Sequence, residues 1–184
     1  MSQDEPSLSN SRLNSLRAAV LGANDGLVST SSIVVGVAGA GSDHKAIFTA
    51  GMAALVAGAL SMAVGEYVSV SSQSDAEKVH IEKVHGGDTS AHEITNPFQA
   101  GFASLVSFTL GGLVPFLAII LSPEHIAIPV TFLAVCIALL ITGYTSATIG
   151  KASRKRAMLR VVVGGLLAMA ITFGVGAAFG TLGK

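Results

Sequence analysis

Charged residues are scarce in this sequence: they make up 12% of its 184 residues, whereas apolar residues make up 51%. A soluble domain carries about 25% charged residues, so this chain has too few to cover a water-facing surface. The formal net charge is zero, which argues against a nucleic-acid partner. The length allows one compact domain. The composition therefore predicts a single-domain integral membrane protein.

Cysteine is also nearly absent. The single cysteine, Cys136, lies in an apolar run, cannot form an intramolecular disulfide, and is interpreted as a small core residue. The chain has neither paired cysteines nor a His-Glu-x-x-His pattern, so neither a structural zinc site nor a zinc enzyme is indicated. A secretory signal is not indicated either, because residues 1–17 are polar and the apolar run after them is too long.

Five apolar stretches are long enough to cross a membrane as helices, which takes roughly 20 residues each. They span about 18–41, 46–70, 98–122, 126–149 and 158–182. A polar loop is expected at 71–97 and a basic connector at 151–160. The predicted fold is an all-α integral membrane protein. Residues 1–17 form a cytoplasmic N-terminal segment and residues 18–184 form one transmembrane domain.

The positive charges predict the orientation of these helices. With a cytoplasmic N-terminus, the cytoplasmic side holds Arg12, Arg17, Lys78, Lys83, Lys151, Arg154, Lys155, Arg156 and Arg160. Only Lys45 and Lys184 then lie on the other side. This bias predicts a cytoplasmic N-terminus and an outside or lumenal C-terminus. The basic residues between 151 and 160 also suit anionic lipid headgroups.

Small residues recur four positions apart within the predicted helices. The sets are Gly22 and Gly26, Gly36 and Ala40, Ala57, Ser61 and Gly65, and Gly176 and Gly180. This spacing lets helix backbones approach closely in lipid, where packing drives association. It predicts a tight bundle and leaves a subunit interface open. A faint similarity between residues 65–69 and 142–146 is compatible with two parallel hairpins followed by a fifth helix.

Asp25 is the one acidic residue within the first predicted helix. It lies about seven residues into that helix, roughly 10 Å below the cytoplasmic surface. An isolated carboxylate there costs at least about 2.5 kcal/mol, so it should face water, an ion or a partner. The neighbouring Asn24 and Gly26 disfavour a regular helix and are candidates for backbone or side-chain support. The structural alternative is a carboxylate that caps a broken helix or hydrogen-bonds to a neighbour.

Met62 in the second predicted helix lies roughly 12 Å from the cytoplasmic surface, nearly level with Asp25. Glu66 follows on the same helix face, closer to the cytoplasm. A carboxylate with a thioether suits Fe²⁺ better than Mg²⁺ or Ca²⁺, with Mn²⁺ tolerable. Ser61 and Tyr67 are candidate supporting residues. The alternative reading of Met62 is simple packing.

The loop predicted at 71–97 is rich in residues that bind metals. Its candidates for transient metal capture are Asp75, Glu77, His80, Glu82 and His85, followed by Asp88, His92 and Glu93. If the second helix continues into the loop, Asp75, Glu82 and His85 fall near one face. A solvated loop of mixed charge is an equal alternative. Asp43 and His44 are interpreted as turn residues, although they could meet an exiting ion.

Two motifs resemble those of the vacuolar iron transporter family. Residues 21–29, LGANDGLVS, resemble its first-helix signature, and residues 58–69, GALSMAVGEYVS, resemble its second. Residues 151–176 are similar to the family's last helix junction. The resemblance covers most of residues 16–182. The chain lacks the long Glu-rich domain that many members of the family insert after the second helix, so it looks like the short, nodulin-like type.

The resemblance implies a five-helix homodimer that moves Fe²⁺, and often Mn²⁺, out of the cytoplasm in exchange for protons. The metal is the transported ion, and no cofactor is expected. In the family, the residues matching Asp25 and Met62 line the path at the dimer interface. The role of Glu66 at the cytoplasmic mouth is our inference. The missing domain puts cytoplasmic metal storage in doubt, and with it a preference for iron over manganese.

We therefore expect alternating access, in which protonation of Asp25 or Glu66 from the outer compartment releases the metal. The membrane would be the plasma membrane in a prokaryote and a vacuolar or other internal membrane in a eukaryote. Two alternatives remain: a membrane-embedded metal-dependent enzyme, or a scaffold subunit that transports nothing. The enzyme is disfavoured because none of the five histidines lies within a predicted membrane helix.

Overall fold

The structure, a computed structural model, describes residues 10–85 and 95–182, which are mainly helical. The helices are α1 (Asn10–Gly39), α2 (His44–His85), α3 (Pro97–Leu121), α4 (Glu124–Ile149) and α5 (Arg154–Leu182). All five are long and apolar enough to span a membrane. The predicted all-α membrane fold with five spanning helices is therefore confirmed.

The helix bounds differ from the prediction at three places. The prediction of a loop at 71–97 is wrong for its first half, because α2 continues as a helix through His85. In addition, α1 begins at Asn10 and α5 at Arg154, so parts of the predicted polar segments are helical. Apolarity marks where a helix crosses lipid, not where it ends. Polar residues extend a helix through side-chain pairs such as Lys78 with Asp75 at 3.6 Å.

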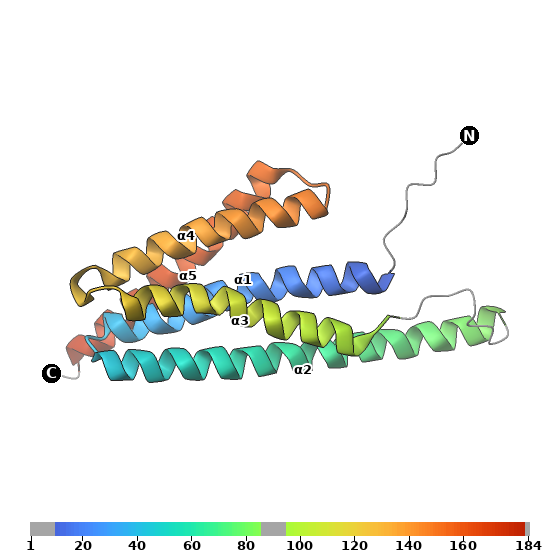
Figure 1. The fold of residues 1–184 in the computed structure, drawn as a ribbon, viewed down its shortest axis with the longest axis horizontal. Coiled ribbons are helices and arrows are strands. Elements are labelled where there is room, and N and C mark those ends of the chain that lie inside the picture. Colours follow the sequence, from blue (N-terminus) through green and yellow to red (C-terminus); the bar gives the residue numbers. More distant parts are fainter. Residues whose placement is uncertain (1–9, 86–94, 183–184) are drawn as a thin grey trace.

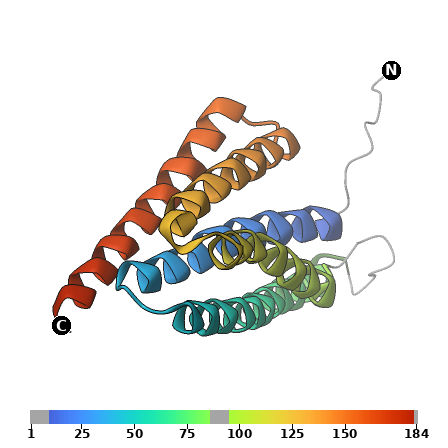
Figure 2. The ribbon, with the colours of Figure 1, turned by 60° about the vertical axis from the view of Figure 1, so that its left-hand side comes forward.

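Helix α1 lies at the centre of the bundle. It contacts each of the other four helices, and its most extensive interface is with α3 (Figure 1). Helix α2 lies along α1 and α3, and the α4–α5 hairpin packs against the other side of α1. The hairpin diverges from α1 toward the α4–α5 turn (Figure 2). We call the end of the bundle with this turn and the start of α1 the basic end.

Small residues bring α1 into backbone contact with α3 and α5. A Cβ atom added at Gly22 would lie 2.7 Å from the carbonyl oxygen of Ser104 in α3. One added at Gly176 of α5 would lie 2.8 Å from the carbonyl carbon of Gly36 in α1. The small-residue spacing therefore serves packing within the chain at these positions. In contrast, Ala57, Ser61 and Gly65 of α2 are exposed.

The turns at the helix ends follow from local sequence. Gly41 adopts a φ of 75°, a left-handed conformation that suits glycine just after a helix. The Asp43 carboxylate accepts a hydrogen bond of 2.8 Å from the Ala46 backbone N–H and so caps α2. Asn96 caps α3 in the same way, with Pro97 in the first turn. The interpretation of Asp43 as a turn residue is confirmed, whereas that of His44 is wrong, because His44 is the first residue of α2.

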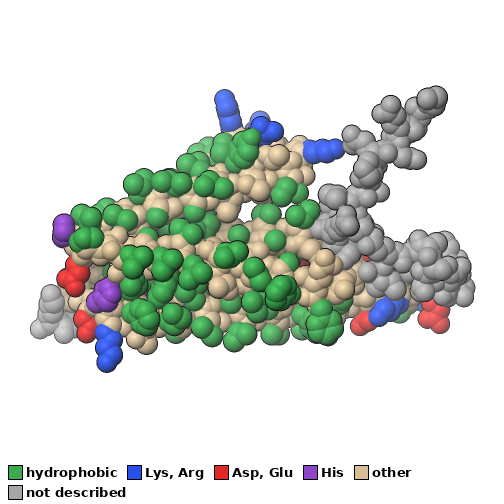
Figure 3. Space-filling model, in the orientation of Figure 1, with side chains coloured by type: hydrophobic (Ala, Val, Ile, Leu, Met, Phe, Trp, Pro, Cys, Tyr) green, Lys and Arg blue, Asp and Glu red, His purple; other side chains and the backbone are tan. Residues whose placement is uncertain are grey.

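The outer surface of the bundle is mainly apolar along its length. Large hydrophobic side chains such as Leu60, Val64, Leu133 and Ile171 are more than half exposed. Figure 3 shows hydrophobic side chains covering the long flank and charged side chains gathered at the two ends. Of the described lysines and arginines, all but Lys45 belong to segments at the basic end. This distribution suits a bundle surrounded by lipid.

The backbone contact between α1 and α5 can be tested with two glycines on one helix. We expect Gly176→Ala to lower the free energy of unfolding in detergent by about 1–3 kcal/mol, because the new methyl group would overlap the backbone of Gly36. Gly174→Ala is the matched control, since a Cβ there meets nothing within 4 Å. Equal stability of the two variants would contradict this packing.

Candidate functional site

An open cavity of about 770 Å³ lies between α1, α4 and α5 toward the basic end. It forms where the α4–α5 hairpin diverges from α1. At its inner end, Gly165 lets α5 approach Leu139 and Val28 closely. Its walls are mostly apolar. The polar residues that line it are Arg17, Asn24 and Asp25 of α1, Thr142 and Ser146 of α4, and Arg160 of α5.

Asp25 lines this cavity on the central helix. Its side chain is partly buried, and α1 continues as a regular helix through it. The Ser29 hydroxyl donates a hydrogen bond of 2.6 Å to the backbone oxygen of Asp25. Within residues 10–85 and 95–182, no donor reaches its carboxylate. The alternative of a carboxylate that caps a broken helix is therefore wrong, and so is the expectation that Asn24 and Gly26 disturb the helix.

Asn24 and Gly26, the neighbours of Asp25, have different roles in the structure. The Oδ1 atom of Asn24 is buried without a hydrogen-bond partner, and Asn24 lines the same cavity as Asp25. A buried carbonyl oxygen without a partner is costly, which makes it a candidate ligand for a cation. Gly26 faces the other way and packs its backbone against Phe108 and Gly112 of α3. Asn24 and Asp25 thus both line the cavity, although the amide oxygen of Asn24 itself has almost no accessible surface in this conformation.

The α2 candidates do not lie in this cavity. None of the described residues that line it belongs to α2, so the structure does not bring Met62 to Asp25 within it. Met62 is partly buried and Ser61 is exposed. Tyr67 packs against Phe98 of α3 in a tilted arrangement, with ring centroids 4.9 Å apart, and so contributes to the contact between α2 and α3.

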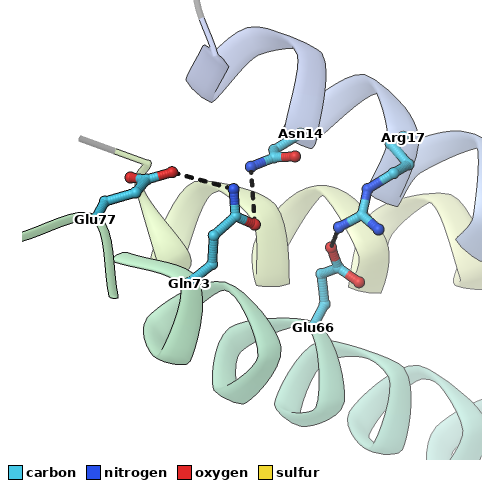
Figure 4. Close-up of polar contacts among 5 residues, drawn as sticks. All are labelled: Asn14, Arg17, Glu66, Gln73 and Glu77. Carbon is cyan, nitrogen blue, oxygen red and sulfur yellow. Dashed lines mark hydrogen bonds and ion pairs between the residues drawn. The ribbon is translucent and has the colours of Figure 1, made fainter. Parts of the chain in front are cut away.

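Glu66 is held by an ion pair between α1 and α2. A terminal nitrogen of Arg17 lies 3.1 Å from Oε1 of Glu66 (Figure 4). The Glu66 side chain is only 9% exposed, whereas that of Arg17 is 58% exposed. Because Arg17 also lines the cavity, it connects Glu66 with the site that contains Asp25.

The candidates for metal capture lie on the extension of α2. Glu77 accepts a hydrogen bond from Gln73 (Figure 4). It also accepts one of 2.9 Å from the Thr95 hydroxyl, so it anchors the chain just before α3. Asp75 pairs with Lys78, whereas His80 and Glu82 are exposed. In the described part of the chain, no three acidic, histidine or cysteine residues are grouped as for a metal ion. The described region excludes the side chain of His85 and residues Asp88, His92 and Glu93.

A second cavity, of about 380 Å³, lies at the opposite end of the bundle. The residues that line it include Asp43, His44, Ser122 and Glu124, from the α1–α2 and α3–α4 turns. It is separated from the first cavity by the apolar core around Leu27, Val35 and Met169. The residues that line the Asp25 cavity all come from the parts of α1, α4 and α5 toward the basic end.

The fold and the site define a class of protein: a helical membrane protein with a carboxylate that no described residue pairs with, in a cavity toward one end of the bundle. A family model described as the VIT family matches residues 16–86 and 77–177. The chain belongs to this family, whose members are membrane transporters, and it is not an enzyme.

Several plant proteins are similar in sequence to this chain over nearly its whole length. The chain is 48% identical to vacuolar iron transporter homolog 4 of Arabidopsis thaliana over 160 residues, which cover 86% of this chain and 81% of the relative. It is 46% identical to homolog 1 of the same plant, with 90% and 84% covered. It is 42% identical to vacuolar iron transporter homolog 2 of rice (Oryza sativa subsp. japonica), with 91% and 92% covered.

Sequence reasoning missed four residues of the cavity wall. Arg17 and Arg160 served only as topology signals, and the segment with Thr142 and Ser146 appeared only as part of a faint repeat. Two hydroxyl residues four positions apart in an apolar helix share one face, which was the available signal. It did not show that this face is turned toward Asp25.

Cysteine labelling tests whether the cavity admits water. In a Cys136→Ala background, we expect Thr142→Cys to react with a water-soluble maleimide, because Thr142 lines the cavity. Ile141→Cys is the matched control, since the Ile141 side chain is 61% exposed on the apolar surface of the bundle. Equal labelling of both cysteines in proteoliposomes would contradict a wet cavity beside Asp25.

Proposed function

We propose that this protein moves Fe²⁺, Mn²⁺ or both out of the cytoplasm in exchange for protons, and that it works as a homodimer. The observation that carries the proposal is Asp25, which lies within a spanning helix, lines a cavity and has no partner for its carboxylate among the described residues. Acidic residues within membrane spans are costly and mark ion pathways. The iron transporter homologs among the relatives support a metal ion as the substrate.

The basic end faces the cytoplasm in this proposal. Lysine and arginine are enriched on the cytoplasmic side of membrane proteins, and the described chain has Arg154, Lys155, Arg156 and Arg160 near the α4–α5 turn. The cavity that reaches Asp25 then opens to the cytoplasm, where the metal enters. Anionic lipid headgroups are the partners that the exposed basic residues would meet.

Metal binding would begin with the oxygen atoms of Asp25 and Asn24. The thioether of Met62 would favour a transition metal over Mg²⁺ or Ca²⁺. A homodimer would bring these residues together, because the exposed stripe of Ala57, Ser61 and Gly65 next to Met62 permits close approach of a second copy. Asp25 and Met62 of each copy would then face a shared path.

Protons would drive release on the other side. When Asp25 or Glu66 takes up a proton from the outer compartment, its charge is lost and the metal is bound more weakly. The relatives are named vacuolar transporters, which supports a vacuolar membrane and offers no support for the plasma membrane. The short extension of α2 would serve metal capture through Asp75, Glu77, His80, Glu82 and His85.

Metal flux into proteoliposomes tests the proposal. Purified protein should carry Fe²⁺ and Mn²⁺ when the pH gradient is imposed with the receiving compartment acidic, and the flux should fall when the gradient is collapsed. Absence of flux would favour the scaffold alternative. Cells that express the protein should also tolerate excess metal better than control cells.

Removing the charge of Asp25 should abolish this flux. We expect Asp25→Asn to lower the rate at least about tenfold, since each 1.4 kcal/mol of lost binding corresponds to a factor of ten. The variant keeps the shape of the side chain, so the fold should be unchanged. Glu124→Gln is the control, because Glu124 is exposed in the first turn of α4, at the end of the bundle opposite the Asp25 cavity. Transport by Asp25→Asn at the wild-type rate would refute the site.

Replacing the thioether should change the selectivity between metals. We expect Met62→Leu to raise the KM for Fe²⁺ by about threefold or more and to affect Mn²⁺ less, because Fe²⁺ is the softer ion. Met52→Leu is the matched control at an exposed position on the same helix. Parallel changes for both metals would indicate that Met62 only packs.

A further inference from the structure

The ion pair between Arg17 and Glu66 lies at the mouth of the proposed path. Figure 4 shows Arg17 extending from α1 to Glu66 on α2. The distance between the two charged groups is 3.1 Å. A fixed positive charge at the entrance of a cation path should repel the cation. The pairing with Glu66 removes most of that repulsion while the path is empty.

The two partners differ in their freedom to move. Glu66 is nearly buried, so its carboxylate is confined between helices, whereas more than half of the Arg17 side chain is exposed. As long as it is ionised, a buried carboxylate needs a compensating charge. The exposed arginine can rotate away toward the open cavity that it also lines. Arg17 is therefore the movable half of the pair and Glu66 the fixed half.

We propose that Arg17 is a tethered counter-ion of Glu66, which an arriving divalent metal ion displaces. The inference rests on the proposed function. A divalent ion attracts the carboxylate twice as strongly as the guanidinium group does at equal distance. Na⁺ and K⁺ carry the same charge as the guanidinium group and lack its hydrogen bonds, so they do not displace it. The pair thus selects divalent over monovalent ions before they reach Asp25.

Two arginines of the cavity provide a matched comparison. Arg17 and Arg160 both line it, but only Arg17 reaches Glu66. Arg17→Gln frees Glu66, whereas Arg160→Gln removes the same charge from the cavity and leaves the pair intact. Arg17→Lys keeps the charge with fewer hydrogen-bond donors. Mn²⁺ flux into proteoliposomes is measured for each variant at several concentrations of K⁺.

We expect Arg17→Gln to lower the KM for Mn²⁺ by about two- to fivefold, the range given by breaking a part-exposed ion pair. The maximal rate should change less than the KM. Competition by K⁺ should appear in Arg17→Gln and be suppressed again in Arg17→Lys. Arg160→Gln should keep the wild-type response to K⁺. A merely structural pair would affect the amount of folded protein and not the response to K⁺.

The remaining outcomes refute either the displacement of Arg17 alone or the proposed function as well. If the wild type carries Mn²⁺ but Arg17→Gln and Arg160→Gln respond alike to K⁺, the displacement of Arg17 is refuted and the proposed function stands. If the wild type carries no Mn²⁺ or Fe²⁺, the proposed function is refuted together with this inference. If Arg17→Gln does not fold, Arg17→Lys decides: because lysine makes fewer hydrogen bonds to Glu66, its KM for Mn²⁺ should fall, and a KM equal to that of the wild type would refute the inference.

Discussion

The close backbone contact of α1 with α3 and α5 is the constraint on which the rest of the structure depends. In lipid, helices gain little from burying apolar side chains, so association depends on packing at short range. Gly22 and Gly26 provide it toward α3, and Gly36 provides it against Gly176 of α5. These contacts make α1 the central helix and determine which of its faces remains open. Asp25 lies on the open face.

The same packing explains why the Asp25 cavity lies toward the basic end. The α5 helix lies directly on α1 near Gly36, and it diverges from α1 beyond Gly165, where bulkier side chains line both helices. Water and ions can therefore approach Asp25 from the basic end. Toward the opposite end, the buried cluster around Leu27, Val35 and Met169 closes the path. A transporter that alternates between two sides would have to rearrange this cluster.

The chain uses its few charged residues in two ways. Asp25 has no partner among the described residues and is open to a ligand, whereas Glu66 is balanced by Arg17. Glu77 holds the start of α3 through Thr95 and is therefore structural as well as acidic. Residue type alone therefore does not make a glutamate of the α2 extension a metal ligand. The contacts of each residue show whether its carboxylate is already used within the fold.

The sequence by itself determined the five spans, the charge asymmetry and the position of Asp25 within a span, because lipid demands long apolar helices and makes an isolated charge costly. It did not determine the extent of α2, since helix formation and apolarity are separate properties. Only the tertiary structure decided that Asp25 faces α4 and α5, that Met62 lies outside that cavity, and that Arg17 binds Glu66. A helical repeat shows which residues share a face, but the crossing of the helices decides what that face meets.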